Sequence, residues 1–279
     1  MLTLIQIELY KIFRKWRTYI GFIAIGILIP VIHIAMYYSG SDAIDGRAAN
    51  LQSSFMITGN LVNGYLASYL IMMSLVIHIP FLITLVAGDL LAGEATAGTY
   101  RMLITRPVSR TQIITAKFLA GIIYTFILIL WLAFTSLVIG SFILGKGELL
   151  IVNEQGLIVF AQNDILWRFC LAYLYAGLSM SVVAGLAFLF SSLVENAIGP
   201  IIATMALIIV LLIMSTIPVE FLRSFKPYFF TSYMLDWMLF FTDPFELSEI
   251  LKSSSILIAH LASFYLIGLY LFNRKDILS

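Results

Sequence analysis

The side chains best suited to chemistry lie in one polar segment, residues 94–110, between two long apolar stretches. It carries Glu94, Arg101, Arg106 and Arg110 in a chain of which charged residues make up only 11%. Guanidinium groups and a carboxylate on a short helix form directional, charge-assisted hydrogen bonds. The segment is therefore predicted to bind a soluble partner protein and not to catalyse a reaction itself.

The order of residues within this segment predicts a short helix, a sharp corner and a newly started helix. Residues 94–105 favour a helix despite Gly98, and Pro107 ends it because the residue before a proline is pushed out of the α region. Ser109 and Gln112 fit a capping box at the start of the next helix. A plain connecting loop would explain the arginines, but not the helix, corner and cap together.

A near match to a phosphate-binding loop occurs at residues 140–146, which fit G-x-x-x-x-G-K. The next residue is Gly147, so the hydroxyl that binds magnesium in such loops is missing. Cys170 is the only cysteine, which excludes a disulfide framework and a thiol metal cluster. We therefore predict no cofactor, metal site or ATP hydrolysis in this chain.

The three histidines, His33, His78 and His260, lie singly in apolar stretches and match no metal-binding spacing. A lone histidine in a span is most often a helix contact, although ionisable groups inside a membrane suggest function. His78 is the strongest candidate for the transport pathway or its gating, because Pro80 two residues later frees backbone groups and favours a kink.

Two acidic residues near the same polar segment allow two interpretations each. Asp89 either stabilises its own helix junction by pairing with Arg101 or Arg106, or makes a gating contact. A central aspartate would cost about 2.5–3.5 kcal/mol in a span, so it must reach water or a cation. Glu195 is either a solvated charge or a second contact to the partner.

The composition places these residues in a membrane protein. Hydrophobic residues make up 61% of the 279 residues and charged residues 11%, against about 25% charged in soluble domains. This much apolar surface needs lipid as its solvent. The net charge of +1 gives no bulk attraction to nucleic acid.

Six apolar stretches are long enough, or nearly so, to cross about 30 Å of hydrocarbon. They are Tyr19–Tyr38, Tyr65–Ala92, Phe118–Leu144, Phe169–Phe190, Ile198–Ile217 and Ile256–Phe272, the last extended from Leu251. The fourth and fifth are predicted to form a tight helical hairpin, with Asn196, Gly199 and Pro200 in the turn. We predict an all-α integral membrane protein with six spans, formed as a single domain by residues 1–279.

Basic residues cluster before the first span, between the second and third, and after the last, in about ten positions against six on the other side. By the positive-inside rule both termini are predicted to be cytoplasmic. Residues 1–17 favour an amphipathic helix in the membrane interface, with its basic side toward lipid phosphates. A simple anchor for the first span and a structural role beside a partner subunit remain alternatives.

Two segments on the opposite side have their own patterns. Residues 149–160 resemble a β-hairpin with a four-residue turn. Residues 218–255 are dense in aromatic rings with scattered charges, which is typical of the headgroup region. This second segment is predicted to form one or two short re-entrant or interfacial helices whose rings mostly serve as an aromatic belt.

Taken together, these features resemble the ABC-2 type permeases, the membrane subunits of one class of ATP-binding-cassette exporters. The motif that carries the resemblance is Glu94-x-x-x-Gly98-Thr99-x-x-x-Leu103-x-Thr105-x-Pro107-Val108-Ser109-Arg110, followed by Lys117. The resemblance implies that this region is a coupling helix held in a groove of a separate ATPase subunit, which binds the ATP and magnesium. The implied contacts are Glu94, Thr99, Tyr100, Arg101, Thr105, Arg106, Pro107 and Arg110.

The resemblance also implies two permease subunits, identical or related, around a pathway in a prokaryotic cytoplasmic membrane. Nucleotide-driven closure of the ATPases would move the coupling helices and open the pathway outward. The competing class is a stand-alone secondary transporter or channel, which would need intramembrane coupling charges and usually internal repeats. Neither is evident in the sequence, and no constellation for an intramembrane enzyme is present.

Overall fold

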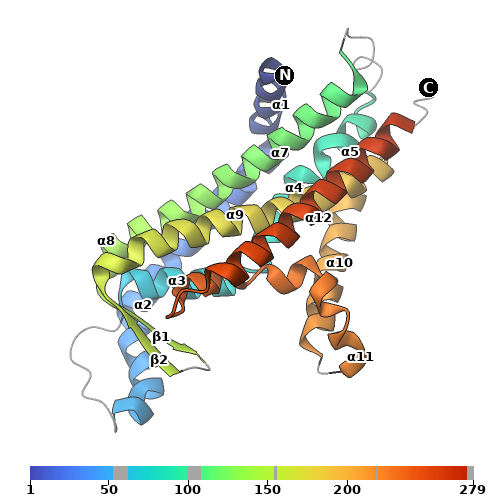
Figure 1. Ribbon diagram of the computed structural model, residues 1–279. Coiled ribbons are helices and arrows are strands. Elements are labelled where there is room, and N and C mark those ends of the chain that lie inside the picture. Colours follow the sequence, from blue (N-terminus) through green and yellow to red (C-terminus); the bar gives the residue numbers. More distant parts are fainter. Residues whose placement is uncertain (53–61, 100–107, 154–155, 218, 275–279) are drawn as a thin grey trace.

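The long apolar stretches form a bundle of helices, seen in the computed structural model of Figure 1. The structure describes residues 1–52, 62–99, 108–153, 156–217 and 219–274. Its long helices are α2 (Trp16–Gln52), α7 (Arg110–Ala133), α9 (Gln162–Leu193), α10 (Ile198–Thr216) and α12 (Leu247–Arg274). In these described ranges five helices are long and apolar enough to span a membrane, or six when one bent pair counts as a span.

The bent pair stands where the second span is predicted. Instead of one helix, α3 (Gly64–Ser74) and α4 (His78–Ala87) meet at an angle of 62°, and α5 (Asp89–Thr96) follows. Pro80 lies in the first turn of α4, has no N–H and crowds the carbonyl four residues earlier. The kink predicted from Pro80 is confirmed, and it lies just before His78.

The third span is a composite of three helical pieces over Arg110–Leu144. After α7 the chain continues as a π-helix, η1 (Phe134–Ile139), and then as α8 (Gly140–Leu144). The near match to a phosphate loop therefore begins inside a helix, whereas a phosphate loop follows a strand. The His33 side chain also fills the space beside Gly140.

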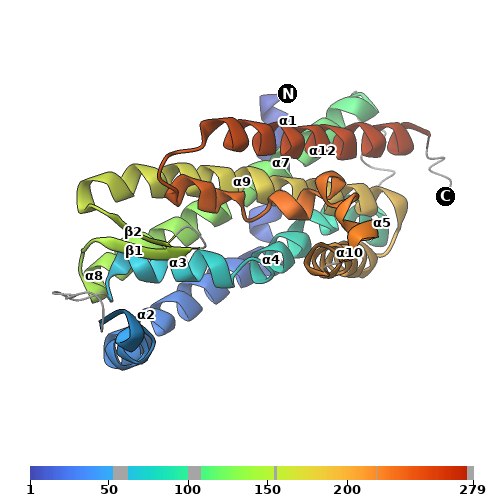
Figure 2. The same cartoon turned by 60° about the horizontal axis from the view of Figure 1, so that its bottom comes forward.

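Helix α9 forms the centre of the bundle, and most residues of its most apolar stretch are buried inside the protein. Figure 2 shows it between α12 on one side and α3 and α4 on the other, and it also packs against α7 and α10. A side-chain carbon at Gly177 would lie 2.5 Å from the Phe126 ring, so this close crossing requires glycine. The predicted tight turn is confirmed, because α9 ends at Leu193 and α10 begins at Ile198. The two helices do not form an antiparallel hairpin, since Figure 2 shows α10 end-on where α9 runs across the view.

The predicted β-hairpin is confirmed as well. Strands β1 (Leu149–Asn153) and β2 (Gly156–Phe160) pair antiparallel, with Leu149 opposite Phe160. Leu149 and Phe160 are buried against the bundle. The two residues between the strands lie outside the described residues.

The aromatic segment differs from its prediction. It forms four short helical turns, α11 (Glu220–Arg223), η2 (Lys226–Tyr228), η3 (Phe230–Tyr233) and η4 (Asp236–Phe241). Buried rings are Phe230, Trp237, Phe240 and Phe241, and exposed ones are Phe221, Phe225 and Tyr228. Trp237 and Phe241 meet Tyr69 edge to face, an arrangement that favours ring pairs over contact with headgroups. The four buried rings are therefore part of the core, and an aromatic belt stays a prediction for the remaining rings of the segment.

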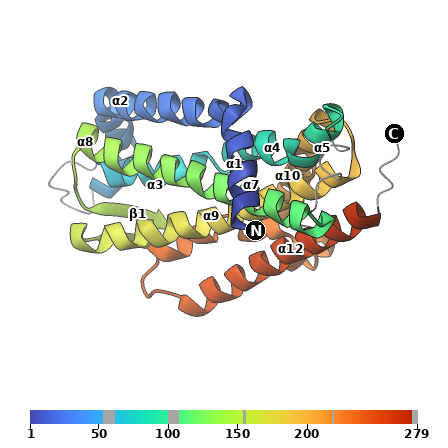
Figure 3. The same ribbon diagram turned by 90° about the horizontal axis from the view of Figure 1, so that it is seen from above.

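One end of the bundle gathers segments that are distant in sequence. Figure 1 shows helix α1 (Leu2–Arg14), α5, the start of α7 and the end of α12 at this end, whereas the β-hairpin and α8 lie at the other. Seen from above in Figure 3, α1 lies across α7. The two ends of the described chain thus lie on the same side of the spans, as the even span number predicts.

Candidate functional site

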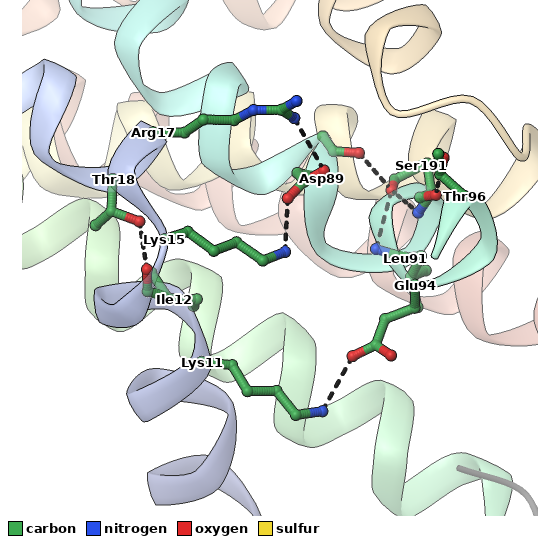
Figure 4. A network of polar contacts seen from close by, with 12 residues as sticks. Lys11, Ile12, Lys15, Arg17, Thr18, Asp89, Leu91, Glu94, Thr96 and Ser191 are labelled. Carbon is green, nitrogen blue, oxygen red and sulfur yellow. Dashed lines mark hydrogen bonds and ion pairs between the residues drawn. The ribbon is translucent and has the colours of Figure 1, made fainter. Parts of the chain in front are cut away.

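Seven charged side chains meet where α1, α5 and α7 come together, and we call this cluster the charged junction. Its members are Glu8 and Lys11 of α1, Lys15 and Arg17 at the corner between α1 and α2, Asp89 and Glu94 of α5, and Lys117 of α7. Figure 4 shows α1 and the α1–α2 corner directing their cations toward α5. The junction adjoins the polar segment predicted to bind a partner.

Lys117 is the buried centre of the charged junction. Its Nζ atom lies 2.7 Å from Oε2 of Glu8 and 2.9 Å from Oε1 of Glu94, and its side chain is 2% exposed. A buried ammonium is tolerated only when carboxylates and hydrogen bonds offset its lost hydration. Two carboxylates from two other helices do so here, which fixes the relative positions of α1, α5 and α7.

Lys11 completes a ring of four alternating charges. Its Nζ atom lies 2.9 Å from Oε1 of Glu8 and 3.0 Å from Oε1 of Glu94. Burial disfavours the ammonium form, but the hydrogen bonds and negative charges of these two carboxylates outweigh it and raise the pKa of Lys11. Each cation of the ring Glu8–Lys117–Glu94–Lys11 therefore lies between two carboxylates.

Glu94 has more partners than any other carboxylate of the junction. Burial opposes its ionised form, yet the Lys117 charge and hydrogen bonds from Thr99, Lys117 and Lys11 lower its pKa to about 2. The Thr99 hydroxyl donates to the Glu94 carboxylate. Glu94 and Thr99, both predicted as partner contacts, are thus engaged inside the chain.

Asp89 pairs with cations of the α1–α2 corner. Its carboxylate lies 2.6 Å from Lys15 Nζ and 3.3 Å from an Arg17 guanidinium nitrogen. The two arginines predicted as its partners lie outside the described residues. Lys11 and Lys15, on the basic side of α1, turn toward acids of α5, and contact of this side with lipid phosphates stays a prediction. The interpretation that Asp89 stabilises a helix junction agrees with these contacts.

Helix α5 ends earlier than the predicted helix over residues 94–105. It stops at Thr96, and Gly98 adopts a positive φ of 66°. The Thr99 N–H donates to Glu94 O and the Gly98 N–H to Ala95 O, the two bonds of a Schellman cap. Gly98 therefore ends α5, where we expected the helix to continue through it.

The predicted capping box at the C-terminal end of the polar segment is confirmed. The Ser109 hydroxyl accepts from the Gln112 N–H at 3.2 Å, and the Gln112 side chain accepts from the Ser109 N–H at 3.2 Å. Arg110 is the first residue of α7. The remaining predicted contacts Tyr100, Arg101, Thr105, Arg106 and Pro107 lie outside the described residues.

Of the other predicted site residues, one lies beside α5 and one does not. Glu195 lies in the turn between α9 and α10, and its carbonyl accepts from the Thr96 hydroxyl at 2.7 Å. His78 instead lines an apolar cavity of about 350 Å³ between α2, α4 and α10. The structure therefore does not bring His78 together with Asp89.

An open cavity of about 370 Å³ lies within the charged junction. Its lining includes charged side chains of α1, α5 and α7 and the hydroxyl-bearing residue that follows α5: Glu8, Lys11, Arg14, Glu94, Lys117 and Thr99. This lining combines both signs of charge with apolar positions of α1 and α5, and suits contact with charged groups of another protein better than binding of an apolar ligand.

The sequence analysis missed the roles of Glu8, Lys11, Lys15 and Lys117. Lys117 carried a usable signal, because a single lysine followed directly by an apolar span must find a buried partner. Glu8 carried another, since it is the one acid of an otherwise basic amphipathic helix. Neither signal identified which residues would pair.

Comparison with known proteins agrees with this architecture. A family model described as "ABC-2 family transporter protein" matches residues 2–277. An uncharacterized protein, YhcI of Bacillus subtilis (strain 168), is 25% identical over 118 residues, which cover 40% of this chain and 37% of that protein. The alignment with YhcI thus spans well under half of either chain. Because the family model covers nearly the whole sequence, this chain belongs to the ABC-2 family of transporter proteins.

Proposed function

We propose that this chain is the substrate-conducting subunit of an exporter and is driven by a separate ATPase subunit that binds ATP and magnesium. Two such permease subunits pair around the pathway, in a prokaryotic cytoplasmic membrane. Both termini and segment 94–110 face the cytoplasm, where the ATPase binds. Family membership supports the permease role. The ATPase partner, the outward direction of transport and the cytoplasmic position of the termini are our proposal.

The observation that carries the proposal is the way both ends of segment 94–110 are fixed. At its start Glu94 is bonded to Lys11 and Lys117, so α5 is joined to α1 and α7. At its end the Ser109–Gln112 capping box sets where α7 begins. A polar segment mounted this firmly can transmit a push from an external protein to the spans, whereas a loose connecting loop could not.

The mechanism follows from these contacts. Nucleotide-driven closure of the ATPase subunits displaces segment 94–110, and the charged ring makes α1, α5 and α7 follow together. Helix α5 continues directly from α4, so the displacement also acts on the break between α3 and α4. Segment ends and helix breaks are where such motions are absorbed.

The test uses charge reversal of Arg101 or Arg106 in the permease co-expressed with its candidate ATPase. We expect loss of co-purification with normal membrane insertion, because these charges form the contact. Pro107→Ala keeps the charges but changes the corner, so we expect assembly with lowered ATP turnover in proteoliposomes. The matched control is Lys146→Glu, a reversal of an exposed charge at the opposite end of the bundle.

Three results would overturn the proposal. The first is wild-type assembly and turnover in all the segment 94–110 variants. The second is saturable binding of magnesium-ATP to the purified permease alone. The third is an outward reporter fused at Ser279, or an inward reporter in residues 39–50, since either would place the polar segment on the wrong side.

A further inference from the structure

A serine from α9 lies between two backbone groups at the start of α5. The Ser191 hydroxyl oxygen lies 2.6 Å from the carbonyl oxygen of Gly88 and 2.8 Å from the amide nitrogen of Ala92. Residues 88 and 92 are four apart, and because α5 begins at Asp89 these two groups also form its first helical hydrogen bond. Ser191 also accepts from the Leu91 N–H at 3.1 Å.

This bonding is unusual for a serine near the end of a helix. Such hydroxyls generally donate to a carbonyl three or four residues earlier in their own helix. The adjacent Ser192 does so, donating to Leu189 O at 2.6 Å, and Ser181 donates to Gly177 O at 2.7 Å. Ser191 is fully buried and bonds across to another helix instead.

Two further contacts lie at the ends of α5. At its far end the Thr96 hydroxyl donates to Glu195 O, in the turn between α9 and α10. Just before its near end a side-chain carbon on Gly88 would lie 3.1 Å from Ile201 and 3.3 Å from Pro200, so the backbone there packs closely against the first turns of α10. The turn thus contacts one end of α5, and α10 contacts the other.

We propose that Ser191 is a positioning residue that makes α5 and the α9–α10 turn move as one rigid unit. A displacement of segment 94–110 then reaches α10 directly, in addition to its path through α4 and α7. The transport consequence rests on the proposed function, whereas the rigid unit itself is a property of this chain alone.

Removing the hydroxyl has a specific structural consequence. In Ser191→Ala, Gly88 O and the Ala92 N–H keep the bond that they form within α5, but the Leu91 N–H loses the Ser191 hydroxyl and α5 loses its hydrogen bonds to α9. We therefore expect α5 to separate from α9, with the protein still folded. Ser192→Ala is the matched control, because it removes a neighbouring buried hydroxyl that bonds only within α9.

The first experiment uses the full permease without any ATPase. Spin labels at Ala97→Cys and Ile202→Cys, both exposed positions, report the distance between the end of α5 and α10 in a Cys170→Ser background. We expect one narrow distance distribution in the parent and in Ser192→Ala, and a shifted or broadened one in Ser191→Ala. Amide-resolved hydrogen exchange at Leu91 should accelerate about tenfold in Ser191→Ala, the equivalent of one lost hydrogen bond. Unchanged distances and exchange in Ser191→Ala would overturn the rigid unit.

The second experiment adds the candidate ATPase and magnesium-ATP with vanadate. In the parent the distance between the labels should stay constant while α10 moves relative to a label on α12. In Ser191→Ala the ATPase should still co-purify, but the α10 movement should be reduced several-fold. An α10 movement of normal size would overturn the transmission role. Failure of any ATPase to bind wild type would contradict the proposed function and leave the first experiment's result standing.

Discussion

The Nζ atom of Lys117 lies 2.7 Å from Oε2 of Glu8, a residue 109 positions earlier in the chain. This contact makes the N-terminal helix part of the bundle, because a buried ammonium on α7 depends on a carboxylate from α1. An amphipathic helix held only by lipid would be free to slide in the interface. Here α1 is held in register with α5 and α7.

Replacing Lys117 with methionine should strongly destabilise the protein. The change keeps the length of the side chain but leaves Glu8 and Glu94 with Lys11 as their shared cation, and removing one partner of a buried pair costs about 3–5 kcal/mol. The measurement is the midpoint of denaturant unfolding in detergent micelles. Lys252→Met is the control, since Lys252 is 62% exposed in its pair with Glu249 and solvent-exposed pairs contribute little to stability.

A compensating variant separates charge from packing. Adding Glu94→Gln to Lys117→Met removes one of the two carboxylates that must then share Lys11, so we expect part of the lost stability to return. If the double variant is less stable than Lys117→Met, then the cost arises from packing and the ring of charges is not its cause.

The low pKa of Glu94 predicts a loss of stability in acid. Its pKa falls from 4.5 to about 2 on folding. A depressed carboxylate pKa stabilises the folded state above the unfolded value, so this contribution is complete above about pH 5 and is lost as the pH falls from 4.5 toward 2. The full effect is on the order of 3 kcal/mol. Unfolding midpoints measured between pH 2 and pH 7 should therefore fall less steeply in Glu94→Gln than in wild type, and equal slopes would contradict the prediction.

Much of the fold follows from the sequence because lipid imposes simple rules. Span length, turn chemistry and hydrophobic periodicity predict the helices, the tight turn between α9 and α10, the β-hairpin and the Ser109 cap. The second span is predicted as one apolar stretch with a kink at Pro80, and that kink is confirmed. The size of the bend could not be predicted, because it is set by tertiary packing.

The charged junction could not be predicted in full, because pairing across helices depends on their rotation and depth. Lys15 and Arg17 pair with Asp89, 74 and 72 positions away in the chain, and no spacing in the sequence indicates these pairs. The effect of Gly98 on the helix could not be predicted for a different reason. A glycine inside a helical pattern either lowers its stability or ends it, and only the two Schellman bonds decide between them.

The contacts of Asp89 predict that removing its charge and removing its two cations have unequal effects on stability. The carboxylate side chain is 10% exposed, whereas Lys15 and Arg17 are about half exposed. Asp89→Asn should therefore cost little, because both cations can turn to water. Lys15→Ala combined with Arg17→Ala should cost more, because it leaves a nearly buried charge unpaired. The midpoint of thermal unfolding in detergent checks this order, and a larger cost for Asp89→Asn would contradict it.

His33 and Gly140 predict a steric coupling between α2 and α8. His33 is fully buried, and both of its ring nitrogens lack a partner among the described residues. A side-chain carbon at Gly140 would lie 2.7 Å from His33 Nε2, so Gly140→Ala should destabilise the protein by about 1–3 kcal/mol through overpacking. His33→Ala opens the needed space, and the double variant should be more stable than the sum of the two single changes predicts. Unfolding midpoints of the four proteins in the cycle give this interaction energy. Strict additivity would show that the two residues do not contact one another.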